Sequence, residues 1–201
     1  TRIKYTVVDP KGSTWAFVID KSVCDRDNGI LVGYELVTPV ISDLYYLRDV
    51  LAVLLDAGCY VNNTCGLHIH IDKPELQQAV NLLKWFANSQ DGIVSLFGIP
   101  NCRLIRFCKK YPQSLVQGLS TREFKDYDDL LRFYHELLNG KVFGSSSYWK
   151  DDSNPARYYL LNFNSLCKIG TIEFRLFNST LSFLVIKGYI NWLESIPCIS
   201  A

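Results

Sequence analysis

Two short motifs bring together side chains that bind metals and phosphates. CGLHIHID contains His68 and His70, and GTIEFRLF, further along the chain, contains Glu173 and Arg175. Both motifs alternate between apolar and polar residues, which predicts β-strands. Because side chains alternate between the two faces of a strand, the histidines share one face of the first strand, and Glu173 and Arg175 share one face of the second.

Two further carboxylates end predicted strands. Asp20 ends the strand predicted over residues 15–20, and Glu35 lies in the strand predicted over residues 30–37, each pointing away from its apolar neighbours. Carboxylates and imidazoles on one side of a sheet suit a divalent cation, and a nearby arginine suits a phosphate oxygen. The pattern therefore favours a nucleotide-phosphate site built without a glycine-rich loop.

Other interpretations of the same residues remain open. Glu173 and Arg175 also fit an ordinary surface ion pair, with His68 and His70 as partly solvated strand residues. A zinc hydrolase would use His68, His70 and a carboxylate, although the chain has no HExxH helix and no third ligand at short spacing.

The elements that must position these residues predict an α+β fold. The predicted strands form hairpins, with helices inserted between them along the chain. This order favours an antiparallel sheet with helices packed on one face and an open polar surface on the other. The predicted strands cover residues 3–8, 15–20, 30–37, 67–71, 158–162 and 171–177, and the predicted helices cover 43–57, 74–88, 121–139 and 182–194.

Composition narrows the class of protein. The chain has 201 residues with 21 Lys and Arg against 20 Asp and Glu, and no basic block, so we expect no nucleic-acid or membrane partner. It also lacks an apolar run near the roughly 18 residues of a membrane span. Its seven cysteines are odd in number and form no CxxC pair, which predicts mostly buried, non-catalytic free thiols in a cytoplasmic protein.

Taken in order, the motifs resemble the amidoligase family. This family belongs to the carboxylate–amine ligases with a glutamine-synthetase-like catalytic fold, which also include glutamate–cysteine ligases. The similar segments extend over nearly the whole chain and are DKSV at 20–23, GYELVTP at 33–39, CGLHIHID at 65–72, RYYLLN at 157–162 and GTIEFR at 170–175.

The resemblance implies that ATP, with Mg²⁺ or Mn²⁺, phosphorylates a small-molecule or peptide carboxylate, and that an amine then displaces phosphate from the acyl phosphate. It implies roles residue by residue. The implied metal ligands are Glu35, His68 or His70, Glu173 and, with less regular spacing, Asp20; Arg175 contacts the transferring phosphate, and Arg157 and Asn162 contact nucleotide or substrate. Composition alone adds Arg103 and Arg106 as candidates for binding a substrate carboxylate.

One family feature is missing from this sequence. The family's domain begins with a strand that carries a Gly-x-Glu-x-Glu pattern, and no such pattern precedes Trp15; the chain also has no methionine. We interpret residues 1–201 as one glutamine-synthetase-like catalytic domain without its N-terminal strand and helix. A non-catalytic binding or structural remnant of the ligase fold is the remaining alternative.

Overall fold

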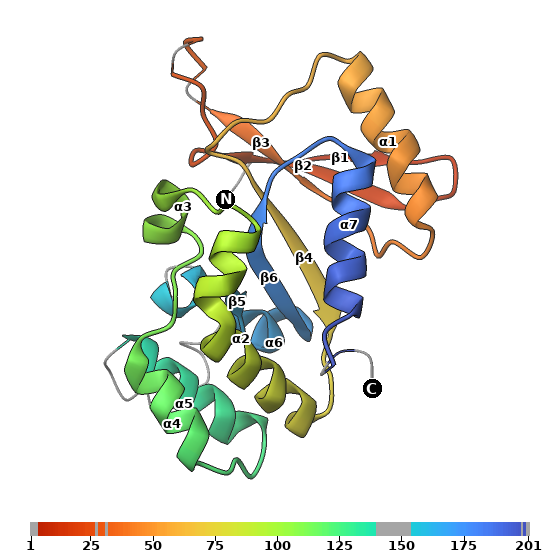
Figure 1. Ribbon diagram of the computed structural model, residues 1–201. Helices are drawn as coiled ribbons and strands as arrows, with labels where there is room; N and C mark the ends of the chain where they lie inside the picture. Colours follow the sequence, from red (N-terminus) through yellow and green to blue (C-terminus); the bar gives the residue numbers. More distant parts are fainter. Residues whose placement is uncertain (1–3, 27, 31, 140–153, 198, 200–201) are drawn as a thin grey trace. The chain divides into compact units, whose positions relative to one another are not determined.

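The protein forms two compact units, described here by a computed structural model (Figure 1). Unit 1 comprises Thr1–Cys65 with Ser179–Ile190, and unit 2 comprises Gly66–Asn178 with Asn191–Ala201. The described residues are 4–26, 28–30, 32–139, 154–197 and 199. Each unit contains one three-stranded antiparallel sheet, and the described residues form seven α-helices. The α+β class is therefore confirmed, with two small sheets in place of the single sheet expected; the glutamine-synthetase-like topology stays a prediction.

Unit 1 is built on a meander of β1 (Lys4–Val8), β2 (Thr14–Asp20) and β3 (Gly33–Val37). Asp9 fixes the first turn, because its carboxylate accepts hydrogen bonds from the backbone N–H groups of Lys11 and Ser13 and from the indole of Trp15. Local side-chain bonding of this kind is what makes Asp a turn residue.

Helix α1 (Leu44–Asp56) begins one residue later than the sequence predicts, because Asp43 is its N-cap and its carboxylate accepts the N–H of Tyr45 at 3.0 Å. Aromatic contacts hold unit 1 together. Tyr46 meets Trp15 of β2 with ring centroids 6.2 Å apart, and Tyr45 meets Phe183 at the start of α7 (Phe183–Glu194) at 5.7 Å.

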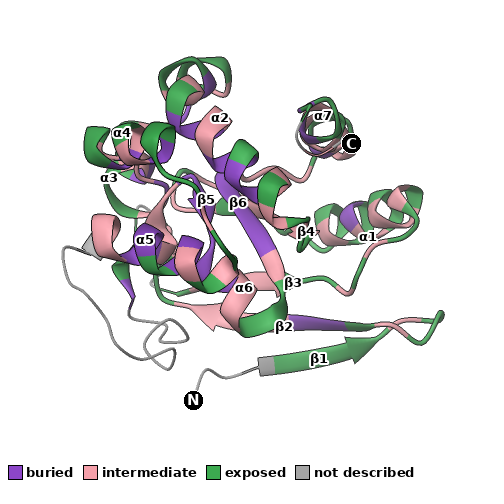
Figure 2. Cartoon of the chain, turned by 90° about the horizontal axis from the view of Figure 1, so that it is seen from below, coloured by how far each residue is buried: buried purple, intermediate pink, exposed green. Residues whose placement is uncertain are grey.

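Unit 2 has the strand order β4-β6-β5, with β4 (Gly66–Asp72) and β5 (Leu161–Asn162) antiparallel to the central β6 (Thr171–Asn178). All residues from Ile172 to Phe177 are buried, and Figure 2 shows β6 in the colour of buried residues along most of its length. The expected open polar face is therefore wrong for this strand, because the side chains on both of its faces are buried.

Aromatic side chains fill the apolar side of the sheet in unit 2. Phe86 of α2 (Leu76–Leu96) packs on Phe174 of β6 at 5.6 Å, and Trp192 packs on Phe97 at 4.7 Å. The sequence predicts that this helix ends near residue 88, but its apolar face continues through the buried Ile93, and the helix ends only before Gly98, which has a φ of 54°.

The remaining elements of unit 2 correct two sequence-based expectations. The helix expected over residues 121–139 begins only at Tyr127, where Asp126 accepts the N–H of Asp129, and the preceding helix, which ends at Thr121, is not predicted by the sequence. The strand expected over 158–162 shrinks to two residues between a 3₁₀ turn and a short helix that the sequence does not predict. The elements are α3 (Asn101–Arg106), α4 (Gln113–Thr121), α5 (Tyr127–Asn139), η2 (Pro155–Tyr158) and α6 (Asn164–Ile169).

A β-bulge in β6 changes which side chains share a face. Leu67 pairs with Phe177 and Ile69 pairs with Phe174, so one β4 residue lies opposite two β6 residues. Strict alternation would place Phe177 on the face of Glu173. The extra residue turns Phe177 to the apolar face instead, where its ring meets that of Phe97 at 5.2 Å.

Cysteine burial and helix length complete the comparison with the sequence. The six cysteines in the described part of the chain are all free thiols, but only Cys108 is buried, and Cys59 and Cys102 are exposed, so the expectation of mostly buried thiols is wrong. Cys198 lies outside the described residues. Among the helices described, none is long and apolar enough to span a membrane.

Two buried tyrosines replace a neighbouring strand at the edge of unit 2. The Tyr111 hydroxyl accepts the N–H of Leu161 and donates to its carbonyl, both at 3.1 Å. The Tyr134 hydroxyl donates to the same carbonyl at 2.7 Å. These contacts satisfy the outer edge of β5, the strand that carries Asn162.

We predict that Tyr111→Phe lowers the free energy of unfolding by about 2 kcal/mol, because it leaves the buried N–H of Leu161 without its acceptor. Tyr134→Phe is the matched comparison. The Tyr134 hydroxyl can donate to the Ala156 carbonyl, 3.0 Å away, or to the Leu161 carbonyl, which Tyr111 also serves, so its loss leaves the Leu161 N–H with its acceptor and should cost less. Urea unfolding of both variants measures the difference; equal losses would contradict this account of the edge.

Candidate functional site

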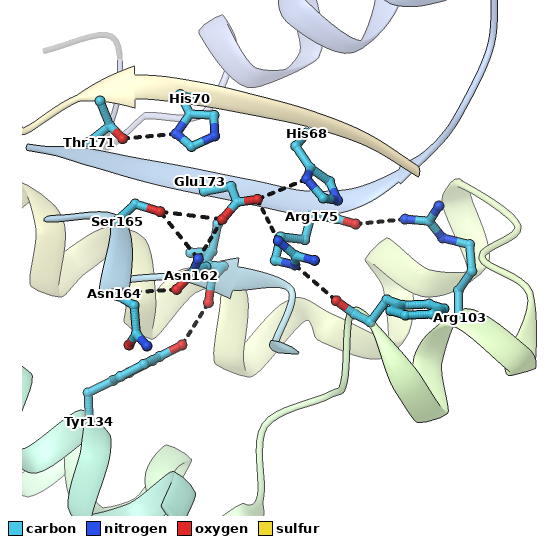
Figure 3. A network of polar contacts seen from close by, with 12 residues as sticks. His68, His70, Arg103, Tyr134, Asn162, Asn164, Ser165, Thr171, Glu173 and Arg175 are labelled. Carbon is cyan, nitrogen blue, oxygen red and sulfur yellow. Dashed lines mark hydrogen bonds and ion pairs between the residues drawn. The ribbon is translucent and has the colours of Figure 1, made fainter. Parts of the chain in front are cut away.

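Glu173 lies at the centre of a polar row across the sheet of unit 2. His70 of β4 and Asn162 of β5 both pair with it, from opposite sides, so the three side chains share one face (Figure 3). The prediction from strand alternation that Glu173 and Arg175 share a face is consistent with this arrangement, because Arg175 Nη1 lies 2.6 Å from Glu173 Oε1.

Four side chains donate to the Glu173 carboxylate. Oε1 accepts from His68 Nδ1 at 2.9 Å and from Arg175, while Oε2 accepts from Asn162 Nδ2 and from Ser165 Oγ at 3.3 Å. Glu173 is only 5% exposed, and burial by itself opposes ionisation. The hydrogen bond from His68 and the charge of Arg175 outweigh that burial and hold the pKa of the Glu173 carboxyl well below its usual range.

The two histidines of CGLHIHID have different surroundings. His68 contacts Glu173, and its side chain is about a quarter exposed. His70 is exposed, and its Nδ1 lies 2.9 Å from the hydroxyl of Thr171. The structure therefore places His68 in direct contact with the buried carboxylate.

Arg175 is buried, which excludes the interpretation of Glu173 and Arg175 as a surface ion pair. Its Nε donates to the carbonyl of Phe107 at 3.1 Å, and its guanidinium lies 5.6 Å from the ring centroid of Tyr158. The half-buried Arg157 guanidinium lies 5.3 Å from the same ring. Tyr158 thus lies near both arginines. Its position next to Arg157 in RYYLLN is only a weak indication in the sequence that it belongs to the site.

Asn162 is engaged within the protein. Its amide nitrogen donates to Glu173 and to Ser165 Oγ at 3.2 Å, and its amide oxygen accepts the N–H of Asn164 at 2.9 Å. These contacts orient the carboxylate and start α6; contact with a nucleotide stays a prediction for Asn162 and for Arg157. No sequence signal identifies Ser165 as part of the site.

The other two predicted metal ligands belong to unit 1. Glu35 pairs with Val18, which places Glu35 and Asp20 on the same face of that sheet. The Asp20 carboxylate accepts hydrogen bonds from the backbone N–H and the hydroxyl of Ser22 at 2.8 and 2.7 Å.

The described side chains do not by themselves fit a bound metal. No group of three or more His, Cys, Asp or Glu side chains in the described part of the chain is close enough to hold an ion. In unit 2, the oxygen of Glu173 nearest His68 already faces the Arg175 cation, whereas Mg²⁺ prefers an octahedral set of oxygen ligands. Metal binding by Asp20, Glu35, His68, His70 and Glu173 stays a prediction, and the chemistry below assigns no step to a metal.

Comparison with known proteins gives one match. The model of a family described as "Putative amidoligase enzyme" matches residues 1–197, which include every site residue named above. This match confirms the resemblance inferred from the motifs. Comparisons with curated proteins and with solved structures gave no match.

We predict that Glu173→Gln is destabilising. The substituted amide would point an N–H group at donors that now face a carboxylate, and it would leave the buried Arg175 without its counter-charge. Breaking a buried ion pair in this way costs about 3 kcal/mol. Urea unfolding measures the loss, with the exposed Glu123→Gln as control; equal stability of the two variants would contradict the contacts described for Glu173.

A second prediction concerns His135, which supports η2, the turn that carries Arg157. His135 is 1% exposed, its Nδ1 lies 3.3 Å from Asn154 Nδ2, and Asn154 caps η2. Burial lowers the pKa of His135 from 6.5 to about 4. Between these values only the unfolded chain takes up the proton, so stability is complete above pH 6.5 and falls as the pH is lowered toward 4.

Between pH 6.5 and 4, His135 should lower the free energy of unfolding by about 3 kcal/mol. Urea unfolding at several pH values measures it, and His135→Gln should flatten the dependence between pH 6.5 and 4. An identical pH dependence in His135→Gln and the parent would show that another group is responsible.

Proposed function

The chain belongs to the amidoligase family, and from that premise we propose that it is an ATP-dependent carboxylate–amine ligase. A substrate carboxylate oxygen attacks the γ-phosphorus of ATP, which yields ADP and an acyl phosphate. The amine nitrogen then attacks the acyl carbon, the bond to the phosphate oxygen breaks, and the nitrogen loses a proton. The products are an amide or peptide bond and inorganic phosphate.

The observation that carries this proposal is the buried contact of Glu173 with both His68 and Arg175, on the two motifs that most resemble the family. Phosphoryl transfer needs positioned cations more than it needs a protein nucleophile. Arg175 and Arg157 lie near one tyrosine ring. Guanidinium groups match the geometry of phosphate oxygens, so two of them near one ring support the binding of phosphate.

Arg175 is the residue proposed to contact the transferring phosphoryl group. Glu173 and the carbonyl of Phe107 accept hydrogen bonds from two of the five N–H groups of its guanidinium. Because those two contacts fix the plane of the guanidinium group, its remaining N–H groups are preorganised for phosphate oxygens. Glu173 and Asn162 then act as positioning residues behind it.

His68 is suited to accept the proton that the amine loses. An ionised carboxylate beside Nδ1 favours the tautomer with its proton on Nδ1, which leaves the lone pair on Nε2. The side chain of His68 is about a quarter exposed, which gives a substrate access to its ring. A carboxylate that orients an imidazole in this way is a recurring arrangement for general bases.

We predict that Arg175→Lys lowers ATP-dependent turnover at least tenfold, which corresponds to about 1.4 kcal/mol of transition-state stabilisation. A point charge cannot replace a planar fork that holds Glu173, the Phe107 carbonyl and a phosphate together. Arg132→Lys, an exposed arginine of α5, is the matched control and should keep full turnover. Activity of Arg175→Lys within twofold of the parent would remove Arg175 from the reaction.

The function itself is tested with hydroxylamine, which traps acyl phosphates as hydroxamates. We expect a pool of amino acids and small carboxylic acids to give a hydroxamate and ADP in equal amounts, only when ATP and Mg²⁺ are both present.

Isothermal titration with a non-hydrolysable ATP analogue should show binding that depends on Mg²⁺. Absence of both nucleotide binding and hydroxamate would contradict the ligase and favour the non-catalytic alternative.

A further inference from the structure

A buried arginine lies directly behind the site. Arg103 of α3 is 2% exposed, and its Nη2 donates to the backbone carbonyl of Arg175 at 3.0 Å (Figure 3). Burying a guanidinium is costly unless it is well hydrogen-bonded. Its position in the interior does not suit the capture of a substrate carboxylate, the role suggested by composition.

The carbonyl that Arg103 contacts belongs to the β-bulge of β6. His68 lies opposite two β6 residues, Arg175 and Leu176, because the register shifts between Leu67 and Ile69. A bulge disrupts the local ladder of backbone hydrogen bonds and re-aims the side chains beside it. Arg103 provides a donor from outside the strand at this point.

Gly66 makes room for the guanidinium on the neighbouring strand. A Cβ atom at Gly66 would lie 2.6 Å from Arg103 Nη1, 2.8 Å from Nη2 and 3.1 Å from Cζ. Gly66 precedes His68 by two residues in β4, so it lies on the same face of that strand. One guanidinium therefore packs against β4 near His68 and bonds to β6 at Arg175.

We propose that Arg103 is a positioning residue that fixes the bulge and thereby sets the relative placement of His68, Glu173 and Arg175. It acts through the backbone of β6 and through its packing on Gly66. Without it, the bulge carbonyl loses a donor, and the strands that carry His68 and Arg175 lose a shared contact. The effect on turnover rests on the proposed ligase function, but the effect on the geometry of His68 does not.

The test compares Arg103→Met with Arg106→Met, an exposed residue of the same helix, in protein labelled with ¹⁵N-histidine. Long-range ¹H–¹⁵N spectra report the tautomer of each histidine, and His68→Gln and His70→Gln assign the signals. In Arg103→Met we expect the His68 signals to shift away from the Nδ1–H form, while those of His135 stay in place. Arg106→Met should leave all three histidines unchanged.

A second comparison tests the packing on Gly66. Gly66→Ala alone should displace the His68 signals, because its methyl group meets the guanidinium. Arg103→Met removes all three of the atoms concerned, so Gly66→Ala should add no further loss of stability in that background. Simple additivity of the two substitutions in urea unfolding would contradict a contact between these residues.

Unchanged His68 signals in a cooperatively folded Arg103→Met protein would overturn the proposal. If that variant does not fold, Arg103→Lys becomes the deciding variant: displaced His68 signals support the positioning role, and unchanged signals overturn it. Where the parent forms hydroxamate, Arg103→Met should lower that rate at least tenfold. A parent without ligase activity would refute the proposed function but would leave the histidine spectra as a complete test of Arg103.

Discussion

The site depends on keeping one buried carboxylate ionised. Glu173 is nearly inaccessible to water, so its charge is sustained only by the donors around it: His68, Arg175, Asn162 and Ser165. An unpaired charge at such a position would be strongly destabilising. The same contacts that make the fold possible therefore orient an imidazole and a guanidinium for chemistry.

The four side chains that donate to Glu173 come from four different elements of unit 2. β4 supplies His68, β5 supplies Asn162, and α6 supplies Ser165. β5 is only two residues long and depends on the hydroxyls of two buried tyrosines, because no further strand covers its outer edge among the described residues. Stability and site geometry are thus set by the same few hydrogen bonds.

The sequence predicts the parts of this site that follow from local periodicity. Alternation along two strands is enough to place His68, Glu173 and Arg175 on polar faces, and the motif order is enough to identify the family. The bulge escapes prediction because it depends on contacts between distant segments, such as Arg103 with the Arg175 carbonyl. The burial of the polar face cannot be predicted from the sequence for the same reason. Arg175 donates to the Phe107 carbonyl, and Phe107 lies in a segment without clear periodicity.

The ionisation of Glu173 is the central claim, and ¹³C NMR of protein labelled at the glutamate side-chain carboxyl carbons measures it directly. Glu173→Gln assigns the signal, and the pH is lowered from 7 toward the limit of the folded state. The contacts described here predict that Glu173 keeps the chemical shift of a carboxylate well below pH 4.5, its ordinary pKa, while exposed glutamates titrate near that value. A titration midpoint of Glu173 at or above 4.5 would contradict the account.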